Sequence, residues 1–593
     1  MKRSKYRTIV KKLFSLVITL NLFAVNAQVK PGGIQLNQEG FYPNAGKLAV
    51  VTKKATGDAF YLLSANLKDT VYTGSLGSPL QSKNSSTITR IADFSSFKKA
   101  GKYVIAVPGV GNSFPFKINK NIHNAAGVAV LKGYYFQRVS MPLEQAYAGK
   151  WSRPAGHNDT AVLIHASAAS AERPTGTVIS TPGGWYDAGD YNKYIVNSGI
   201  TMGTLLSAYE DFPQYFDRLN TNIPESKNDV PDLLDEVIYN LRWMLSMQDP
   251  YDGGVYNKCT NADFDGMVMP GITKAPRYAV QKGTAATLDF AAVTAQSSRV
   301  LQKFNSQFPG LADSCFAAAT KAWEWAQVNP AMPYNQNMIN QKYLPKINTG
   351  GYGDNKFDDE IFWAACELFA TTKDQRYLAT IQKGITAPVR IPSWANVHLL
   401  GLYTLFRTSQ SLPTELLPLI DDARNRFIKF ADELASGMED NAFKTVMGKS
   451  KNDFNWGSNS SASNQGIVLV NAYQFTKNKK YIDAALTNLD YILGRNATGY
   501  CFVTGIGSRP TMHPHHRQSV ADGIEQPVPG LLAGGPNPGK QDGCKYEFSE
   551  PETTYADEDC SYASNEIAIN WNAPLVYLAN AIEALQYLVG YSK

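Results

Sequence analysis

The chain has 593 residues, 44% hydrophobic and 18% charged, a composition that excludes global disorder and supplies enough apolar material for a large core. The formal net charge of +6 comes entirely from residues 1–27, where basic side chains occur without any acid. Because the rest of the chain carries no net charge, a nucleic acid is not expected as a partner.

Residues 1–27 have the pattern of a secretory signal peptide. A basic stretch over residues 1–12 precedes an apolar run over residues 13–25, and the small residue Ala27 follows. The alternative is a single membrane anchor, but the run is short for a bilayer span of about 20 residues. We therefore expect cleavage after Ala27 and export, to the periplasm or out of the cell, with no membrane as partner.

Residues 28–118 are expected to form a small all-β domain. Short alternating runs, such as residues 47–52, 59–63 and 102–107, are separated by polar turns that contain glycine. Their regular spacing favours an antiparallel sandwich of the immunoglobulin-like type. No row of exposed aromatic residues is evident, so we expect this domain to brace the next one rather than to bind sugar.

Residues 119–593 change to long segments of helical period. About twelve helices without intervening strands suggest six helical hairpins that close into a double ring with one open face. Loops over residues 250–275, 330–355 and 497–560 are rich in Gly, Pro and aromatic residues and are expected to line that face. The helices are predicted to begin near residues 122, 195, 229, 278, 310, 356, 375, 394, 415, 460, 478 and 563.

Residues 183–191 contain two aspartates three positions apart. One helical turn there would point the Asp187 and Asp190 carboxylates in similar directions. Such a pair can hold one water, with one carboxylate accepting its proton and the other fixing its orientation. The alternative is a helix N-cap, where Asp is common.

Residues 504–517 hold three of the seven histidines, His513, His515 and His516, next to Arg517. The cluster could bind a metal, a phosphate or sugar hydroxyls. Zinc is disfavoured, because a third and fourth ligand are not evident in this proline-bearing loop. Aromatic residues make up 11% of the chain, which favours a carbohydrate partner, since flat side chains stack on sugar rings.

Glu566 lies among aromatic residues at the start of the last apolar helix. A carboxyl in such surroundings loses solvation when it ionises, so its pKa rises and it can stay protonated as a general acid. The alternative is a glutamate that caps the helix.

Six cysteines are too few for a disulfide-dense scaffold. Cys544 and Cys560 flank one loop and could pair after export. Cys315 and Cys366 lie in apolar helical patterns, which favours buried, unreactive thiols.

With these motifs the chain resembles the glycoside hydrolase family 9 endoglucanases that carry an N-terminal immunoglobulin-like domain. The family's first signature matches residues 501–517, with Cys501 where Ser, Thr or Val is usual. Its second signature is matched in full over residues 555–573. The likeness covers essentially everything after the predicted signal peptide.

The resemblance implies a mainly α fold, an (α/α)6 barrel behind the small β domain, and inverting hydrolysis of internal β-1,4-glucosidic bonds in cellulose or related β-glucans. Asp190 matches the general base, Asp187 the aspartate that positions the water, and Glu566 the general acid. Inverting enzymes hold base and acid roughly 6.5–9.5 Å apart. Further matches are His515 and Asp557 at active-site positions, Arg517 at a substrate-binding position, and Trp394, which resembles a sugar-stacking tryptophan or else belongs to the core.

The resemblance also bears on which metals the chain is expected to bind. Relatives often hold a structural zinc with two Cys and two His, but only His157 of these four is present, beside Val139, Gly156 and Tyr186. We therefore expect no zinc and no required cofactor. Calcium is an option, with solvated loops and helix caps as the alternative. Its candidate ligands are Asp263, Asp265, Asp354, Asp358, Asp359 and Glu360.

Other functions stay open at this stage. The same machinery could act on xyloglucan or mixed-linkage glucan, or as an exo-acting glucosidase or glucosaminidase, because loops select the chain and its end. From another class, the barrel could bind polysaccharide without activity, although Asp187, Asp190 and Glu566 are all present. The expected partner is a β-glucan polysaccharide or oligosaccharide, bound by a monomer.

Overall fold

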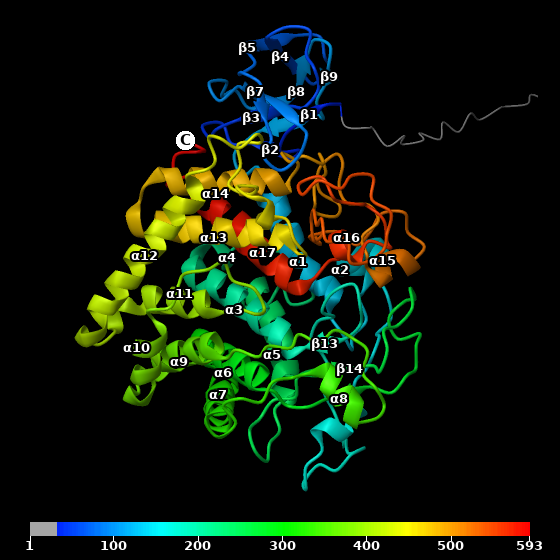
Figure 1. Ribbon diagram of the computed structural model, residues 1–593, viewed down its shortest axis with the longest axis vertical. Coiled ribbons are helices and arrows are strands. Elements are labelled where there is room, and N and C mark those ends of the chain that lie inside the picture. The colour runs from blue at the N-terminus through cyan, green and yellow to red at the C-terminus, as the bar shows by residue number, and fades with distance from the viewer. Residues whose placement is uncertain (1–31) are drawn as a thin grey trace, which may run out of the picture.

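A computed structural model describes residues 32–593, so the predicted signal peptide over residues 1–27 lies outside the described part. Figure 1 shows a small β domain at one end of a larger helical domain. The predicted fold, an (α/α)6 barrel behind an immunoglobulin-like sandwich, is confirmed. Among the described helices, none has both the length and the apolar character needed to cross a bilayer.

The N-terminal domain is a sandwich of two sheets. Its strands are β1 (Ile34–Gln35), β2 (Gly40–Phe41), β3 (Leu48–Val51), β4 (Ala59–Ser64), β5 (Thr70–Ser75), β6 (Leu80–Gln81), β7 (Ile88–Asp93), β8 (Gly101–Val107), β9 (Gly111–Asn112) and β10 (Phe116–Ile118). One sheet has the order β1-β3-β7-β6, and the other has the order β2-β10-β8-β4-β5 with β9 beside β8. Phe60 and Leu62 of β4 are buried in the core, whereas Tyr61 between them is half-buried, as alternation along a strand requires.

The helical domain begins with α1, a few residues after β10. The helices are α1 (Asn124–Gln137), α2 (Gln145–Ala148), α3 (Ile195–Asp211), α4 (Pro213–Phe216), α5 (Asp232–Ser246), α6 (Thr284–Leu301), α7 (Leu311–Val328), α8 (Gln336–Lys342), α9 (Asp358–Thr372), α10 (Leu378–Gly384), α11 (His398–Thr408), α12 (Leu417–Ala435), α13 (Ser458–Thr476), α14 (Lys479–Ile492), α15 (Arg517–Ala521), α16 (Tyr562–Asn565) and α17 (Ile569–Leu585). The long helices begin close to the predicted positions, because their apolar periodicity is strong.

The long helices of the described part form two rings. The inner ring consists of α3, α6, α9, α11, α13 and α17, packed against the outer helices α5, α7, α10, α12, α14 and α1. Inner helices are enclosed on all sides, so that every residue of α6 except Arg299 is buried. The outer helix α12 buries a single stripe, Ile420, Ala423, Phe427 and Ala431, at the spacing of one helix face.

The expectation that no strands interrupt the helices is wrong. The additional strands are β11 (Val162–Ile164), β12 (Val178–Ile179), β13 (Lys193–Tyr194), β14 (Lys258–Thr260) and β15 (Tyr278–Ala279). They form a sheet in the order β12-β11-β15-β14-β13. Each strand is too short to show an alternating pattern, and β11 pairs with the distant β15, so the sequence gives no local signal for this sheet.

The cysteine predictions are confirmed. Cys544 and Cys560 form a disulfide. Cys315 and Cys366 are free thiols buried in helices of the barrel.

The N-terminal domain contacts the barrel through buried polar groups. The Tyr42 hydroxyl donates to Glu583 of α17 at 2.6 Å, and the Asn37 amide donates to Asp490 of α14 at 2.7 Å. Such pairs are costly to separate, because each partner would lose its hydrogen bond while buried. The contacts support the bracing role of this domain, which stays a prediction.

Candidate active site

A cavity of about 940 Å³ opens on one face of the barrel. It receives side chains from the segment before α3, from the loops after α8, α10 and α12, and from the segment that leads into α17. Of the site residues predicted from the sequence, the cavity is lined by Asp187, Asp190, Trp394, His515, Arg517 and Glu566, whereas Asp557 is not among its lining residues.

The two aspartates lie on an irregular segment, so the predicted helical turn at this position is wrong. Residue Ala188 forms an antiparallel bridge with Ala568, and α3 begins only at Ile195. Gly189 explains the irregular course, since a Cβ there would lie 2.0 Å from the carbonyl oxygen of His515. The close approach brings the segment against the histidine loop, and neither aspartate caps a helix.

Each aspartate is held by one asparagine and one tyrosine. Asn197 and Tyr352 donate to Asp187 at 2.6 and 2.7 Å, and Asn192 and Tyr194 donate to Oδ2 of Asp190 at 2.6 and 3.1 Å. Oδ1 of Asp190 has no donor among the described residues. Burial, followed by the charge of Asp190, raises the pKa of Asp187 well above its usual range.

Glu566 lies in the short extended link between α16 and α17, so it does not cap the last helix. Its backbone pairs in parallel with that of His515. Burial raises the pKa of the Glu566 carboxyl well above its usual range, and the charge of Asp190 raises it further, while Arg517 acts in the opposite direction. The net effect favours the protonated form of the Glu566 carboxyl.

His515 and Arg517 are fixed by backbone carbonyl groups. The Nδ1 atom of His515 lies 2.6 Å from the carbonyl oxygen of Asp559, so this nitrogen is the donor and Nε2 is left as an acceptor. Arg517 donates from Nε to the Asp265 carbonyl at 2.8 Å and from Nη1 to the Gly189 carbonyl at 2.9 Å. Burial lowers the pKa of His515, which favours the neutral imidazole.

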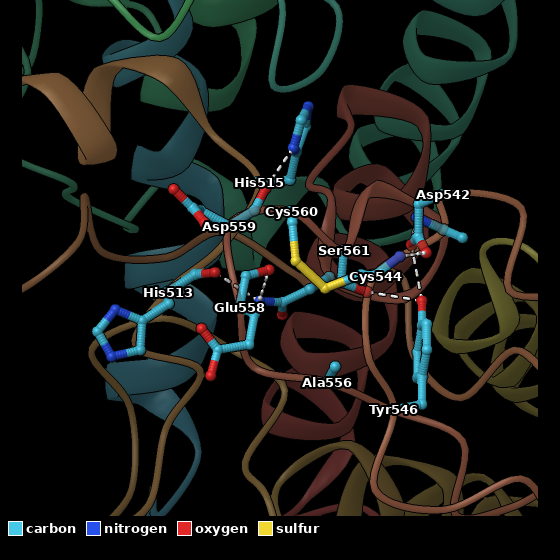
Figure 2. The surroundings of a disulfide bond; sticks show 12 residues. His513, His515, Asp542, Cys544, Tyr546, Ala556, Glu558, Asp559, Cys560 and Ser561 are labelled. Atoms are coloured by element: carbon cyan, nitrogen blue, oxygen red, sulfur yellow. Dashed lines mark hydrogen bonds between the residues drawn. A yellow bond between two sulfur atoms is a disulfide. The ribbon is translucent and has the colours of Figure 1, made fainter.

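Asp557 holds the histidine loop in place. Its carboxylate accepts the backbone N–H groups of Met512 and His513, at 3.0 and 2.8 Å. The Cys544–Cys560 disulfide lies in the same region, next to Asp559 and its contact with His515, as Figure 2 shows.

Aromatic side chains account for much of the remaining cavity wall. Trp394 is half-buried and makes an edge contact with Tyr352 at 5.4 Å between ring centroids, so it belongs to the cavity rather than to the core interior. None of the other aromatic lining residues is among the predicted site residues. Tyr562 and Trp571 nevertheless lie within the second signature, and Phe264 and Tyr352 lie in loops that are predicted to line the open face. The other aromatic lining residues are Tyr194, Phe264, Tyr352, Trp456, Tyr562 and Trp571.

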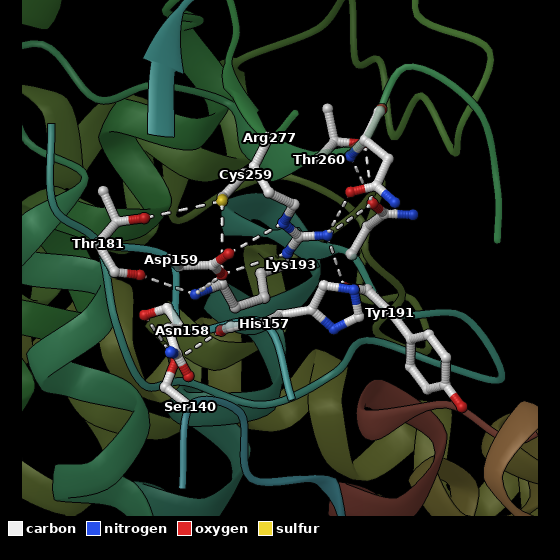
Figure 3. A network of polar contacts seen from close by, with 12 residues as sticks. Ser140, His157, Asn158, Asp159, Thr181, Tyr191, Lys193, Cys259, Thr260 and Arg277 are labelled. Carbon is white, nitrogen blue, oxygen red and sulfur yellow. Dashed lines mark hydrogen bonds and ion pairs between the residues drawn. The ribbon is translucent and has the colours of Figure 1, made fainter. Parts of the chain in front are cut away.

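The region where relatives hold zinc contains hydrogen bonds and ion pairs. His157 Nδ1 lies 2.9 Å from the Tyr186 hydroxyl. Beside them, Asp159 pairs with Lys193 at 2.8 Å and with Arg277 at 3.0 Å (Figure 3). The polar side chains of this region therefore pair with one another. The absence of zinc stays a prediction, which metal analysis of the purified protein tests.

The acids considered as calcium ligands differ in burial. Asp359 and Glu360 are buried at the start of α9 near Asp289 of α6, whereas Asp358 is exposed. Burial and the neighbouring acids raise the pKa of Asp289 and Glu360, and the Asp289 oxygens have no hydrogen-bond partner. Within residues 32–593, no three His, Cys, Asp or Glu side chains are already arranged around a metal position. Calcium binding therefore stays a prediction.

Comparison with known proteins gives consistent matches. The chain matches the family model described as glycosyl hydrolase family 9 over residues 124–579, and that of the cellulase N-terminal ig-like domain over residues 30–112. It is 46% identical over 553 residues to a xyloglucan-specific endo-beta-1,4-glucanase of Bacteroides ovatus, covering 93% of this chain and 94% of that protein. It is 34% identical over 553 residues to endoglucanase D of Acetivibrio thermocellus, covering 92% and 82%. A solved Bacteroides ovatus GH9 structure has a TM-score of 0.89 at 45% identity, covering 93% of this chain and 99% of that chain.

Proposed function

The chain belongs to glycosyl hydrolase family 9 and is an endo-β-1,4-glucanase, and from this premise we propose that it hydrolyses the backbone of cellulose or a related β-glucan with inversion. One observation carries the proposal. Asp187, Asp190 and Glu566 come from two separate motifs and line the same cavity. Two carboxyl groups with separate roles are what inverting hydrolysis requires.

Asp190 is the proposed general base. The donors Asn192 and Tyr194 hold its Oδ2, which leaves Oδ1 to accept a proton from water. Asp187 orients the same water. Because the pKa of Asp187 is raised by burial and by the charge of its neighbour, the pair carries fewer than two negative charges near neutrality.

Glu566 is the proposed general acid. Its raised pKa keeps the carboxyl protonated, so it can give a proton to the departing glucosidic oxygen while water attacks the anomeric carbon. The two events occur on opposite faces of the sugar ring.

The remaining side chains hold the substrate or the loops that touch it. We assign sugar stacking to Trp394 and hydroxyl recognition to His515 and Arg517, which supply orientation rather than proton transfer. Asp557 acts through the backbone of residues 512 and 513, which leads to His515.

Xyloglucan is a second candidate substrate. The relative at 46% identity over 93% of this chain is named as specific for xyloglucan. The two substrates share a β-1,4-glucan backbone, so the same carboxyl groups would serve both.

A comparison of soluble substrates tests the proposal. Purified protein is incubated with carboxymethylcellulose, xyloglucan and mixed-linkage β-glucan, and both reducing ends and viscosity are followed. Endo-action predicts that viscosity falls early, before many reducing ends appear. A rate highest on xyloglucan would select the second candidate, and no hydrolysis of any of the three would refute the proposal.

We also propose that the protein is exported and acts as a monomer without a cofactor. The basic and apolar pattern of residues 1–27 supports export. N-terminal sequencing of the native protein is expected to begin at Gln28, and a mature chain that keeps residues 1–27 would contradict export.

A further inference from the structure

A buried lysine lies behind the aspartate pair and has no part in the reaction steps above. Lys258 of β14 is directly opposite Tyr194 of β13 in the antiparallel sheet, and its side chain is fully buried. Its ammonium group lies 5.4 Å from the centre of the Tyr194 ring. Lys258 therefore lies on the strand that pairs with β13, and β13 leads from the aspartates into α3.

The ammonium group of Lys258 binds the loop over residues 349–352. It donates to Oγ1 of Thr349 at 3.0 Å and to the Gly350 carbonyl at 2.5 Å. Gln336 of α8 accepts a third hydrogen bond at 2.7 Å. All three donor positions of the lysine are thus used, two of them to hold one loop.

The same loop is linked to both aspartates, directly to Asp187 and through Tyr194 to Asp190. The Gly350 N–H donates to the Tyr194 hydroxyl at 3.1 Å, and that hydroxyl donates to Asp190. Tyr352 donates directly to Asp187. Tyr352 has a φ of 45°, a left-handed conformation that is unfavourable for a residue with a side chain, so the surrounding contacts must hold it.

The charge of Lys258 is also placed near the pair. None of the ion pairs in the described part includes this ammonium group, so its charge is not neutralised by a carboxylate in contact with it. Burial lowers the pKa of Lys258 to about 7, and Asp190 acts in the opposite direction. The titratable groups that face Lys258 are Asp190, Tyr194, Tyr334 and His165. Those that face the aspartate pair are also Tyr352, His515 and Glu566.

We propose that Lys258 is a positioning residue for hydrolysis: it fixes the loop over residues 349–352, whose Gly350 N–H holds Tyr194 and whose Tyr352 holds Asp187, and its charge stabilises the negative charge of the aspartate pair. The inference rests on the proposed function, because it assumes that the pair activates water. An uncharged side chain at this position would release the loop and remove the charge together.

Two substitutions at Lys258 test its hydrogen bonds to the loop and its charge. Lys258→Met removes both, and Lys258→Arg keeps the charge. Lys47→Met is the matched control, because Lys47 is buried in the N-terminal domain, where it donates only to the carbonyl groups of Pro43 and Ala45. The three variants and the wild type are compared by kcat and KM on a cello-oligosaccharide across pH.

Lys258→Met is expected to lower kcat about 10-fold to 100-fold with a much smaller change in KM, as for a misplaced catalytic group. The acidic limb of its pH profile, where activity is lost as pH falls, is expected to move up by about half to one pH unit. The reason is that the aspartate pair is neutralised more easily when the positive charge is absent. Lys258→Arg is expected to restore the limb, and Lys47→Met to leave it in place. An unshifted limb and an unchanged kcat in folded Lys258→Met would overturn the inference.

A crystal structure of Lys258→Met distinguishes this inference from the proposed function. The loop over residues 349–352 is expected to move away from Tyr194, whatever the substrate. If the loop stayed in place, the inference would fail even though the wild type hydrolysed β-glucan. If the wild type hydrolysed no β-glucan, the proposed function would fail, and the loop position would still decide the role of Lys258.

Discussion

The backbone of His515 pairs in parallel with that of Glu566, at the point where the histidine loop meets the last inner helix. The residue proposed to hold sugar hydroxyls and the proposed general acid are therefore joined through their backbones. On the other side of this element, Gly189 brings the aspartate segment into contact with the His515 carbonyl. Base, acid and substrate contacts are thus fixed by the backbone before any sugar binds.

The rate of hydrolysis is expected to have a bell-shaped pH profile. The aspartate pair must hold at least one negative charge to accept a proton from water, so activity is lost as pH falls and the pair becomes neutral. Glu566 must be protonated to donate, so activity is lost as pH rises through its pKa, which burial raises. The profile of kcat/KM on a cello-oligosaccharide measures both limbs, and Glu566→Gln is expected to lower kcat about 10²-fold to 10⁴-fold.

An aryl cellobioside with a good leaving group provides the control for this assignment. Such a leaving group needs no proton, so Glu566→Gln is expected to keep substantial activity on it and to lose the alkaline limb. An alkaline limb that persisted in the variant would assign the general acid to another group.

Tyr352→Phe is expected to lower kcat about tenfold, because the hydrogen bond that orients Asp187 is lost. The hydroxyl favours ionised Asp187, so its loss raises the pKa of that carboxyl and moves the acidic limb to higher pH. Tyr343→Phe, at an exposed tyrosine outside the cavity wall, serves as the control. Equal kinetics for the two variants would show that the Tyr352 hydroxyl has no role.

Loss of the Cys544–Cys560 disulfide is expected to lower the melting temperature. It closes a loop with a sequence separation of 16, for which chain entropy gives a contribution of about 3 kcal/mol. The measurement is a melting curve with and without reductant. The double variant Cys544→Ser with Cys560→Ser is expected to melt lower and to be unaffected by reductant, because the other described cysteines are buried free thiols. A reductant effect of equal size in the double variant would contradict this explanation.

Calcium is expected to raise the melting temperature near neutral pH. Asp289, Asp359 and Glu360 are buried near one another, and a bound cation would offset the cost of ionising them. A chelator should reverse the effect, and Asp289→Asn should abolish it, while Asp358→Asn at the exposed neighbouring position should not. Identical melting curves with calcium and with chelator would count against a calcium site.

The sequence predicted those features that depend on local patterns. The long helices follow from apolar periodicity, and the motifs indicated Asp187, Asp190, His515, Arg517 and Glu566, all of which the fold brings to one cavity. Features that depend on distant contacts gave no such signal. One such feature is the contact of Tyr352 with Asp187, although the loop over residues 330–355 is predicted to line the open face and does so. Another is the position of Asp289 of α6 near Asp359 and Glu360.

Two local expectations failed for identifiable reasons. The aspartate segment is not helical, because the close contact of Gly189 with His515 determines its course. The strands β11 to β15 are too short to leave an alternating pattern. Both errors concern chain segments whose shape is set by neighbours rather than by their own residues.

The most direct test of the account is NMR of the anomeric proton during hydrolysis of a cello-oligosaccharide, with the wild type beside Glu566→Gln and Asp190→Asn. With the wild type the α-anomer is expected to appear first, and neither variant is expected to produce it at a comparable rate. Initial release of the β-anomer would contradict inversion, and full activity of either variant would contradict the role assigned to that carboxyl group.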